Sequence, residues 1–400
     1  MTGKKTNQEF IEKSSQVIMN TYGRFPVVLE KGEGCWVWDV EGKKYLDLVA
    51  GIAVNCLGHA HPVVLQALTE QASKLIHTSN LYHTLPGIEL ADLLTKSSFA
   101  DRVFYCNSGA EANEGAVKLA RKYFKKKGQA DRSEVITMTN SFHGRTLAMI
   151  SATGQEKVKK GFEPLMPGFH HVPYNDFKAL ENKVNDKTAA VLLELVQGEG
   201  GVVFADADYL KAVRALCDQK GILLIYDEIQ TGMGRTGTLF AYEHTGIAPD
   251  ILTMAKALAG GLPIGAILAK EAVAQAFEPG DHAATFGGNP LVTHVAKKVL
   301  ETLQLTVLKS SREIGEYLLS NLFIFKEKYK IVSEVRGQGM MLALELSIPG
   351  KEVVLKGLEK GLLLNCTQEK VLRFVPPLVL KKEEVDFAIA QLDAIFKELS

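Results

Sequence analysis

Two residues of opposite charge occur where the surrounding sequence is apolar. Asp227 ends the apolar run 222–226, and Lys256 follows the run 251–254 within Ala-Lys-Ala-Leu-Ala-Gly-Gly. A carboxylate in such a place is costly to bury unless a cation, such as a protonated pyridine nitrogen, meets it. Burial also lowers the pKa of a lysine, and a neutral amine can form a Schiff base. The two residues indicate covalent amine chemistry; an ordinary salt bridge and a solvated lysine are the alternatives.

Three further apolar runs are followed by residues suited to ligand binding. Ser108 and its small neighbours open a predicted helix over 110–127, where backbone amides and the helix dipole favour a phosphate. Phe142 and Arg145, after the next run, could stack on a planar ring and hold a carboxylate. Glu199 stands in a glycine-rich loop after the third run. Each feature also has a structural interpretation, as a helix cap, a core aromatic, a surface ion pair or a loop.

Short apolar runs separated by helical segments predict a mostly parallel sheet covered by helices. In such a sheet, ligands bind beyond the carboxyl ends of the strands. The chemistry-bearing segments all follow predicted strands, so we expect one site at that edge to collect them. The predicted strands cover residues 103–105, 135–138, 189–195, 222–226 and 251–254.

The two ends of the chain have a different pattern. Short strand-like runs occur at 35–38, 340–346 and 371–375, and an amphipathic helix is predicted over 383–398. We therefore expect the ends to pack together as a smaller α+β domain. The predicted division is an N-terminal segment (1–60) that joins the small domain, a large domain (61–309) and a C-terminal small domain (310–400).

The composition argues against several classes of function. Among 400 residues, 46 are basic and 46 acidic, so no excess of positive charge attracts nucleic acid or an anionic membrane. No apolar run approaches the roughly 20 residues that span a bilayer, and the polar N-terminus lacks a signal-peptide core. Five cysteines, none spaced as CxxC, argue against a disulfide framework and favour a reducing compartment. A cytoplasmic location is expected.

Two motifs are set aside. Gly-Met-Gly-Arg-Thr-Gly at 232–237 has the glycine spacing of a dinucleotide-binding loop, but residues 227–231 separate it from the strand and no helix clearly follows. His59 and His61 have no acidic or cysteine partner at useful spacing, which favours a structural loop over a metal site. No nicotinamide cofactor and no metal are predicted.

Together, the motifs resemble the class-III aminotransferases of the fold-type-I pyridoxal phosphate (PLP) family, and among them the N-acetylornithine aminotransferases. The resemblance covers nearly the whole chain, and it implies a seven-stranded sheet with helices on both faces plus the smaller domain. The motifs that carry it are NSGAEAN (107–113), SFHGRT (141–146), QGEGG (197–201), DEIQTGMGRTG (227–237), AKALAGG (255–261) and TFGGNP (285–290).

The resemblance implies PLP as the cofactor. Lys256 would form the Schiff base with PLP and carry the proton between substrate and cofactor, while Asp227 would keep the ring nitrogen protonated. Phe142 would stack on the ring, and Gln230 would contact its phenolic oxygen. An obligatory homodimer is implied, because Thr285 would reach the phosphate from the neighbouring subunit. The implied cofactor-binding residues are Ser108, Gly109, Ala110, Phe142, Asp227, Glu228, Ile229, Gln230, Lys256 and Thr285.

Two substrates bound in turn are also implied, N-acetylornithine and 2-oxoglutarate, with N-acetylglutamate semialdehyde and glutamate as products in arginine biosynthesis. Arg145, helped by Tyr22, would hold the α-carboxylate of acetylornithine, with Ala284 of the neighbouring subunit close to the substrate. Arg373 would hold the α-carboxylate of glutamate. Glu199 would pair with Arg373 while the first substrate is bound and release it for the second.

Alternatives remain within and beyond this family. Gly51-Ile52-Ala53 lacks the extra tyrosine of ornithine aminotransferases, which disfavours free ornithine. Succinylornithine, succinyldiaminopimelate, acetyl-lysine, ornithine and 4-aminobutyrate are alternative donors. A PLP aminomutase or racemase would need no 2-oxoglutarate. A non-enzymatic scaffold is disfavoured because Lys256 and Asp227 are both present.

Overall fold

A seven-stranded sheet forms the centre of the larger part of the molecule. The computed structural model describes residues 6–400. The strands are β4 (Arg102–Cys106), β5 (Glu134–Met138), β6 (Phe169–Val172), β7 (Thr188–Leu193), β10 (Leu223–Asp227), β11 (Ile251–Met254) and β12 (Gly265–Ala269). Their order is β4-β12-β11-β10-β7-β5-β6, and all neighbouring pairs are parallel except the two that β12 makes. The mostly parallel sheet and its five predicted strands are confirmed, whereas β6 and β12 were not predicted.

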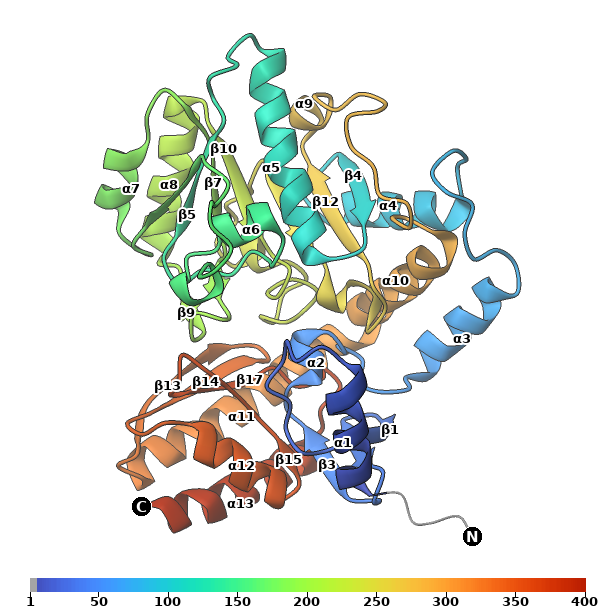
Figure 1. The fold of residues 1–400 in the computed structure, drawn as a ribbon, viewed down its shortest axis with the longest axis vertical. Helices are drawn as coiled ribbons and strands as arrows, with labels where there is room; N and C mark the ends of the chain where they lie inside the picture. The colour runs from blue at the N-terminus through green and yellow to red at the C-terminus, as the bar shows by residue number, and fades with distance from the viewer. Residues whose placement is uncertain (1–5) are drawn as a thin grey trace.

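Helices cover both faces of this sheet because its strands are apolar on both sides. Along β10, Ile225 belongs to one core and Leu224 to another, since neighbouring residues of a strand point to opposite faces. Helix α5 (Gly109–Lys126) packs into the first core, and α8 (Ala207–Lys220) and α10 (Pro290–Thr302) pack into the second. The predicted arrangement of helices on two faces is therefore confirmed (Figure 1).

Shorter elements complete the larger part. They are α3 (Pro62–Ala72), α4 (Leu85–Lys96), α6 (Leu147–Ala152), α7 (Phe177–Lys183), α9 (Glu271–Ala274), the hairpin β8 (Val196–Gln197) and β9 (Val203–Phe204), and 3-10 turns at Glu156–Val158, Ala241–His244 and Lys256–Ala259.

The two ends of the chain meet in the smaller part, which Figure 1 shows in blue and orange-red below the large sheet. Strand β3 (Lys44–Asp47) pairs in parallel with β15 (Leu362–Leu363), so residues from both ends complete one sheet of order β1-β2-β3-β15. A second sheet has the order β13-β14-β17-β16. The division at residues 60 and 309 itself stays a prediction.

The elements of the smaller part are α1 (Asn7–Val17), β1 (Leu29–Glu33), β2 (Trp36–Asp39), α2 (Ala50–Ala53), α11 (Leu308–Lys328), β13 (Val332–Gln338), β14 (Met341–Leu346), α12 (Lys351–Glu359), β16 (Asn365–Thr367), β17 (Val371–Phe374) and α13 (Lys382–Leu399). A π-helical turn, Leu303–Val307, joins α10 to α11. Within residues 6–400, no helix combines the length and apolar character needed to cross a bilayer.

Candidate active site

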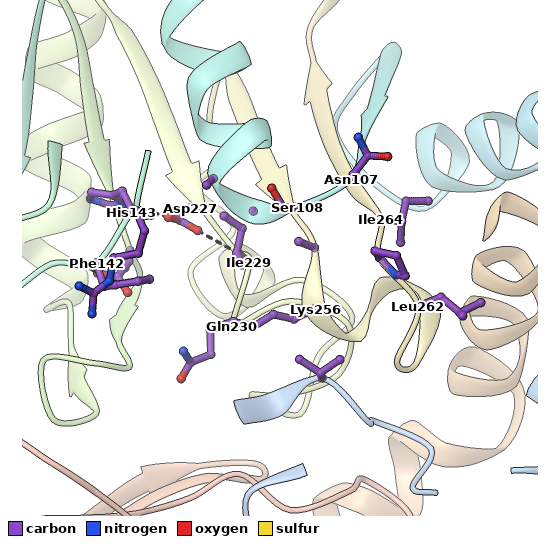
Figure 2. Close-up of a pocket in the computed structure, with 18 of the residues that line it drawn as sticks. Asn107, Ser108, Phe142, His143, Asp227, Ile229, Gln230, Lys256, Leu262 and Ile264 are labelled. Atoms are coloured by element: carbon purple, nitrogen blue, oxygen red, sulfur yellow. Dashed lines mark hydrogen bonds and ion pairs between the residues drawn. The ribbon is translucent and has the colours of Figure 1, made fainter. Parts of the chain in front are cut away.

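A cavity of about 440 Å³ lies where the loops after several strands of the large sheet meet (Figure 2). This size falls within the range of small-molecule sites. The side chains that line it come from segments far apart in the sequence, as expected for the carboxyl edge of a parallel sheet. Nine of the predicted site residues line the cavity, namely Ser108, Gly109, Ala110, Phe142, Arg145, Asp227, Ile229, Gln230 and Lys256.

Asp227 is a buried carboxylate that its neighbours hold in one orientation. Its Oδ2 accepts hydrogen bonds of 2.8 Å from the Asn113 amide and from Nδ1 of His143, and its Oδ1 accepts one of 3.1 Å from the Ile229 backbone. The hydroxyl of Thr253 donates to Asn113 Oδ1 at 2.7 Å, which fixes that amide. Across residues 6–400, the only basic side chain within ion-pair distance of Asp227 is His143. A cation bound in the cavity would complete the environment of the carboxylate.

Lys256 reaches the same cavity from the segment after β11 (Figure 2). Burial lowers the pKa of its amine to about 8, against the opposing effect of the Glu199 carboxylate. The backbone of Lys256 has φ +44, in the left-handed region. That conformation costs a residue with a side chain about 1–2 kcal/mol, and such strain is typical of functional positions. The amine is therefore fixed in place and available as a nucleophile near neutral pH.

The first turn of α5 lines the cavity with Ser108, Gly109 and Ala110. Ser108 caps the helix by accepting a hydrogen bond from Glu111 N–H at 3.2 Å. Helix geometry leaves the amides of Gly109 and Ala110 without an acceptor inside the helix. A Cβ at Gly109 would lie only 2.8 Å from Cδ1 of Ile229, so a larger residue does not fit. This turn can hold a phosphate by backbone amides alone.

Three candidate ligand-binding side chains follow two strands of the sheet. Phe142 and Arg145 come after β5, and Glu194 comes directly after β7. The guanidinium carbon of Arg145 lies 5.5 Å from the centre of the Phe142 ring. The backbone N–H of Phe142 donates to Glu194 Oε2 at 3.1 Å. Burial, and then the charge of Asp227, raise the pKa of Glu194 well above its ordinary value. Arg145 is exposed and has no carboxylate within ion-pair distance in the described part of the chain, so it can bind an anionic substrate.

A second arginine, Arg373, lies on β17 in the smaller part of the molecule and forms an ion pair with Glu199. Its Nη1 lies 2.5 Å from Glu199 Oε1 and donates to Gln230 Oε1 at 3.0 Å. Asn365 Oδ1 accepts from Nε at 3.1 Å and from Nη2 at 2.7 Å. Burial acts to raise the pKa of Glu199, but the positive charges of Arg373 and Lys256 outweigh it and lower that pKa. Four hydrogen bonds hold the guanidinium, only one of them to a carboxylate.

Six of the predicted residues do not line this cavity. Two of them, Glu199 and Arg373, are paired with each other, and Arg373 donates to the lining residue Gln230. Tyr22, Ala284 and Thr285 do not line the cavity, and Tyr22 and Thr285 are exposed. Glu228 turns away from the cavity: its carboxylate accepts hydrogen bonds from the backbone of Ala241 at 2.6 Å and of Tyr242 at 2.8 Å. Burial raises the pKa of Glu228 to about 8. Its side chain supports a neighbouring turn, not a ligand in this cavity.

Residues 17–396 match the model of the family described as aminotransferase class-III. The chain belongs to this family. This membership confirms the prediction of a PLP-dependent aminotransferase.

Relatives and solved structures resemble the aminotransferase over nearly its full length. It is 52% identical to the acetylornithine aminotransferase of Methanocaldococcus jannaschii, covering 98% of this chain and 99% of the relative. It is 54% identical to that of Gloeobacter violaceus, covering 96% of each chain. The N-acetylornithine aminotransferase structure from Stenotrophomonas maltophilia has 41% identity and a TM-score of 0.84, covering 97% and 99%. The ornithine aminotransferase structure from Toxoplasma gondii has 36% identity and a TM-score of 0.95, covering 99% and 96%.

The residues of this aminotransferase fit PLP. Among residues 6–400, Asp227 has no lysine or arginine within ion-pair distance, the α5 turn can take a phosphate, and Lys256 supplies an amine with a lowered pKa. Sequence reasoning missed several residues of the site. Asn113 could have been found from its spacing, since it lies four residues after Gly109 on one face of α5. Sequence reasoning also assigned no role to several residues that line the cavity, including Val54, His143, Glu194, Leu262, Pro263 and Ile264.

Capture of PLP by the cofactor-free aminotransferase should accelerate as the pH rises through about 8, because burial lowers the pKa of Lys256 to that value and only the neutral amine attacks a carbonyl carbon. An ordinary lysine would give a midpoint near about 10.4. Stopped-flow absorbance across this pH range measures the rate constant. The reaction of PLP with free Nα-acetyl-lysine gives the cofactor's own pH dependence as the control. A midpoint near 10 would show that Lys256 is not the attacking amine or is not desolvated.

Proposed function

We propose that this aminotransferase moves the terminal amino group of N-acetylornithine to 2-oxoglutarate, giving N-acetylglutamate semialdehyde and glutamate in arginine biosynthesis. The observation that carries the proposal is the contrast between two arginines at one site. Arg145 has no carboxylate within ion-pair distance among residues 6–400, whereas Arg373 is paired with Glu199. The names of the two relatives reported above, each about half identical to this chain, support the same reaction.

The two arginines allow one site to accept two substrates of different charge. Acetylornithine has one carboxylate, which Arg145 binds while Glu199 neutralises Arg373. 2-Oxoglutarate has two carboxylates, and its second carboxylate replaces Glu199 on Arg373. The Glu199 side chain is 27% exposed, so it has room to move. Asn365 and Gln230 keep the guanidinium in place meanwhile.

The other residues hold the cofactor. The Ser108–Ala110 turn would hold the phosphate, Phe142 would lie against the ring, and Asp227 and Gln230 would meet the ring nitrogen and the phenolic oxygen, while Ile229 packs beside the turn. When bound, PLP supplies an electron sink for the carbon that bears the amine. Lys256 attaches the cofactor and moves the proton at Nζ, for which a pKa of about 8 is suitable near neutral pH.

Steady-state kinetics with a panel of donors test the proposal. We expect the highest kcat/KM with acetylornithine, above succinylornithine, ornithine and 4-aminobutyrate, and an absolute need for 2-oxoglutarate. Arg373→Gln should raise the KM for 2-oxoglutarate by at least about tenfold, the effect of losing one charged hydrogen-bond pair. The first half-reaction with acetylornithine alone should change little. A higher kcat/KM with ornithine would show that acetylornithine is not the preferred amino donor. Turnover without an amino acceptor would indicate an aminomutase.

We further propose a homodimer in which Thr285 reaches the phosphate of the neighbouring subunit. Exposed apolar side chains gather beside the loop that carries Thr285. The Asn80 side chain donates to the backbone of Ala284 at 3.1 Å and of Gly287 at 3.0 Å, which ties residues 75–88 to this loop. Several exposed apolar side chains close together in the chain and tied to one loop are typical of a subunit interface. The exposed apolar residues there are Leu75, Ile76, Leu81, Tyr82, Leu85, Ile88 and Phe286.

Mixing two defective variants should restore activity if sites are shared in this way. A Lys256→Ala subunit paired with a Thr285→Ala subunit forms one site with both defects and one site with neither. Subunits exchanged by mild denaturation and refolding should therefore recover up to about half of the wild-type activity per mixed dimer. The control mixture of Lys256→Ala with Asp227→Ala leaves one defect in each site and should stay inactive. Equal behaviour of the two mixtures would rule out sharing through Thr285.

A cytoplasmic location is part of the proposal. All five cysteines are free thiols, and four of them are buried, as expected for a protein kept in a reducing compartment. We also propose the division into a segment 1–60, a large domain 61–309 and a small domain 310–400. The pairing of β3 with β15 supports the joining of the first segment to the last. Limited proteolysis near residue 309 would test the second boundary.

A further inference from the structure

The segment 232–237, whose glycines have dinucleotide-loop spacing, lies at the joint between the two parts of the molecule. A Cβ added at Gly339, in the smaller part, would lie 2.4 Å from the backbone carbon of Thr236. A Cβ added at Gly234 would lie 2.8 Å from Leu308. The Met340 N–H donates to Arg235 O at 2.9 Å. Gly339 therefore permits close backbone contact between the two parts, Gly234 leaves room for the Leu308 side chain, and Arg235 lies at the joint.

The Arg235 side chain is buried without a carboxylate partner. It is 1% exposed, and its Nη1 donates to the backbone oxygens of Met340 at 3.0 Å and Pro376 at 2.6 Å. Within the described chain, its Nε and Nη2 have no hydrogen-bond partner. Burial lowers the pKa of Arg235 to about 10, which still leaves the group charged at neutral pH. Burying a cation whose hydrogen bonds go only to carbonyl oxygens costs free energy. The presence of a buried, unpaired charge at Arg235 therefore requires an explanation.

Both carbonyl contacts of Arg235 lie close to the second substrate arginine. Pro376 follows Arg373 by three residues, and Met340 directly precedes β14, the strand that pairs with β17. On the other side, Arg235 follows Gln230, the acceptor for Arg373, by five residues. Burial, helped by the charge of Arg373, lowers the pKa of Arg235, and burial raises the pKa of the Cys56 thiol against the opposing effect of the Arg235 charge. The Arg235 side chain thus connects the segment that follows Gln230 to the backbone on either side of the Arg373 strand.

We propose that Arg235 is a positioning residue that gives the Arg373 site its preference for dicarboxylates. Glu199 cancels the charge of Arg373 in the resting site, so a substrate carboxylate must displace an existing anion. The uncompensated charge of Arg235 makes the electrostatic potential at Arg373 more positive. Because the surroundings have a low dielectric constant, this potential strengthens binding of the second substrate carboxylate. A substrate with a single carboxylate, bound at Arg145, gains less from it. The inference rests on the proposed roles of Arg145 and Arg373.

Binding of two unreactive ligands to the PLP-loaded enzyme tests this, measured by calorimetry. Glutarate replaces 2-oxoglutarate, and N-acetylnorvaline, which lacks the terminal amine, replaces acetylornithine. We expect Arg235→Gln to weaken glutarate binding by about tenfold, or about 1.4 kcal/mol, and to change N-acetylnorvaline binding less than about twofold. Arg235→Lys should retain most of the glutarate affinity. Arg312→Gln is the matched control, because that guanidinium donates to Gly237 O at 2.6 Å from the exposed side of the same segment.

A second pair of variants leaves Arg235 in place, in case its replacement prevents folding. Cys56→Asp puts a carboxylate beside the guanidinium and should weaken glutarate binding selectively, whereas Cys56→Asn should not. Equal weakening of both ligands, or no weakening by either Arg235→Gln or Cys56→Asp, would overturn the inference. Failure of glutarate to bind the wild-type enzyme would instead reject the proposed role of Arg373, and the inference with it.

Discussion

Replacement of Lys256 by alanine is expected to lower kcat/KM by at least about four orders of magnitude, the upper range for loss of a general acid–base group. In the proposed function this amine both attaches the cofactor and moves the proton, and no other lysine lines the cavity within the described residues. The rate measurements should be accompanied by mass spectrometry of both enzymes after their reduction with borohydride. The wild-type enzyme should carry the reduced cofactor on the peptide that contains Lys256, and the variant should carry none.

Lys211→Ala provides the matched control, because this lysine is exposed and pairs only with Asp208. It should retain full activity and the labelled Lys256 peptide. Activity in the Lys256→Ala variant within about tenfold of wild type, or a label on another lysine, would exclude Lys256 as the reactive amine.

Asp227→Asn should lower turnover by about two to four orders of magnitude. Removing one partner of a buried ion pair costs about 3–5 kcal/mol, and the amide can no longer stabilise a cationic ring nitrogen. Asn113 and His143 both donate to Oδ2, so an asparagine that keeps its oxygen at that position should retain these two contacts, and the loss should be mainly electrostatic. Single-turnover rates with acetylornithine measure the effect.

Asp250→Asn separates this effect from general damage to the sheet. Asp250 is also buried, and it pairs with Arg214 at 2.9 Å and Lys270 at 2.8 Å, away from the cavity. Its replacement should lower the thermal unfolding temperature and leave single-turnover rates nearly unchanged. If Asp227→Asn instead lost stability while keeping its rate, the carboxylate would be structural.

Strands of the large sheet could be predicted from the sequence where they are apolar runs that end in polar residues. β7, β10 and β11 have this pattern, since each is buried along its whole length. β6 contains two histidines within four residues, and its burial is incomplete, so its pattern is not that of a core strand. The antiparallel direction of β12 depends on how the chain connects after Lys256, which an apolar pattern does not encode.

The site shows a similar limit. Sequence identifies which strand ends carry reactive groups, but not which way each side chain points. Asp227 and Glu228 are adjacent acids, and the backbone turns one toward the cavity and the other toward Ala241 and Tyr242. His143 was present in a recognised motif and Glu194 in the predicted strand 189–195, yet their contacts with Asp227 and Phe142 join segments that meet only in the folded chain. The contacts expected from residues of a neighbouring subunit cannot be seen in the structure of a single chain.

The pairing of β3 with β15 has a consequence for how the protein is made. Strand β3 leaves the ribosome early, but the strand that completes its sheet lies near the other end of the chain. Contacts between such distant segments form slowly, because a long loop must close before they contribute. The large sheet, by contrast, is complete once β12 has been synthesised, and it can fold while translation continues. Since Arg373 follows β15, the substrate site is assembled last, and an interrupted chain would have the reactive lysine but no means of binding the second substrate.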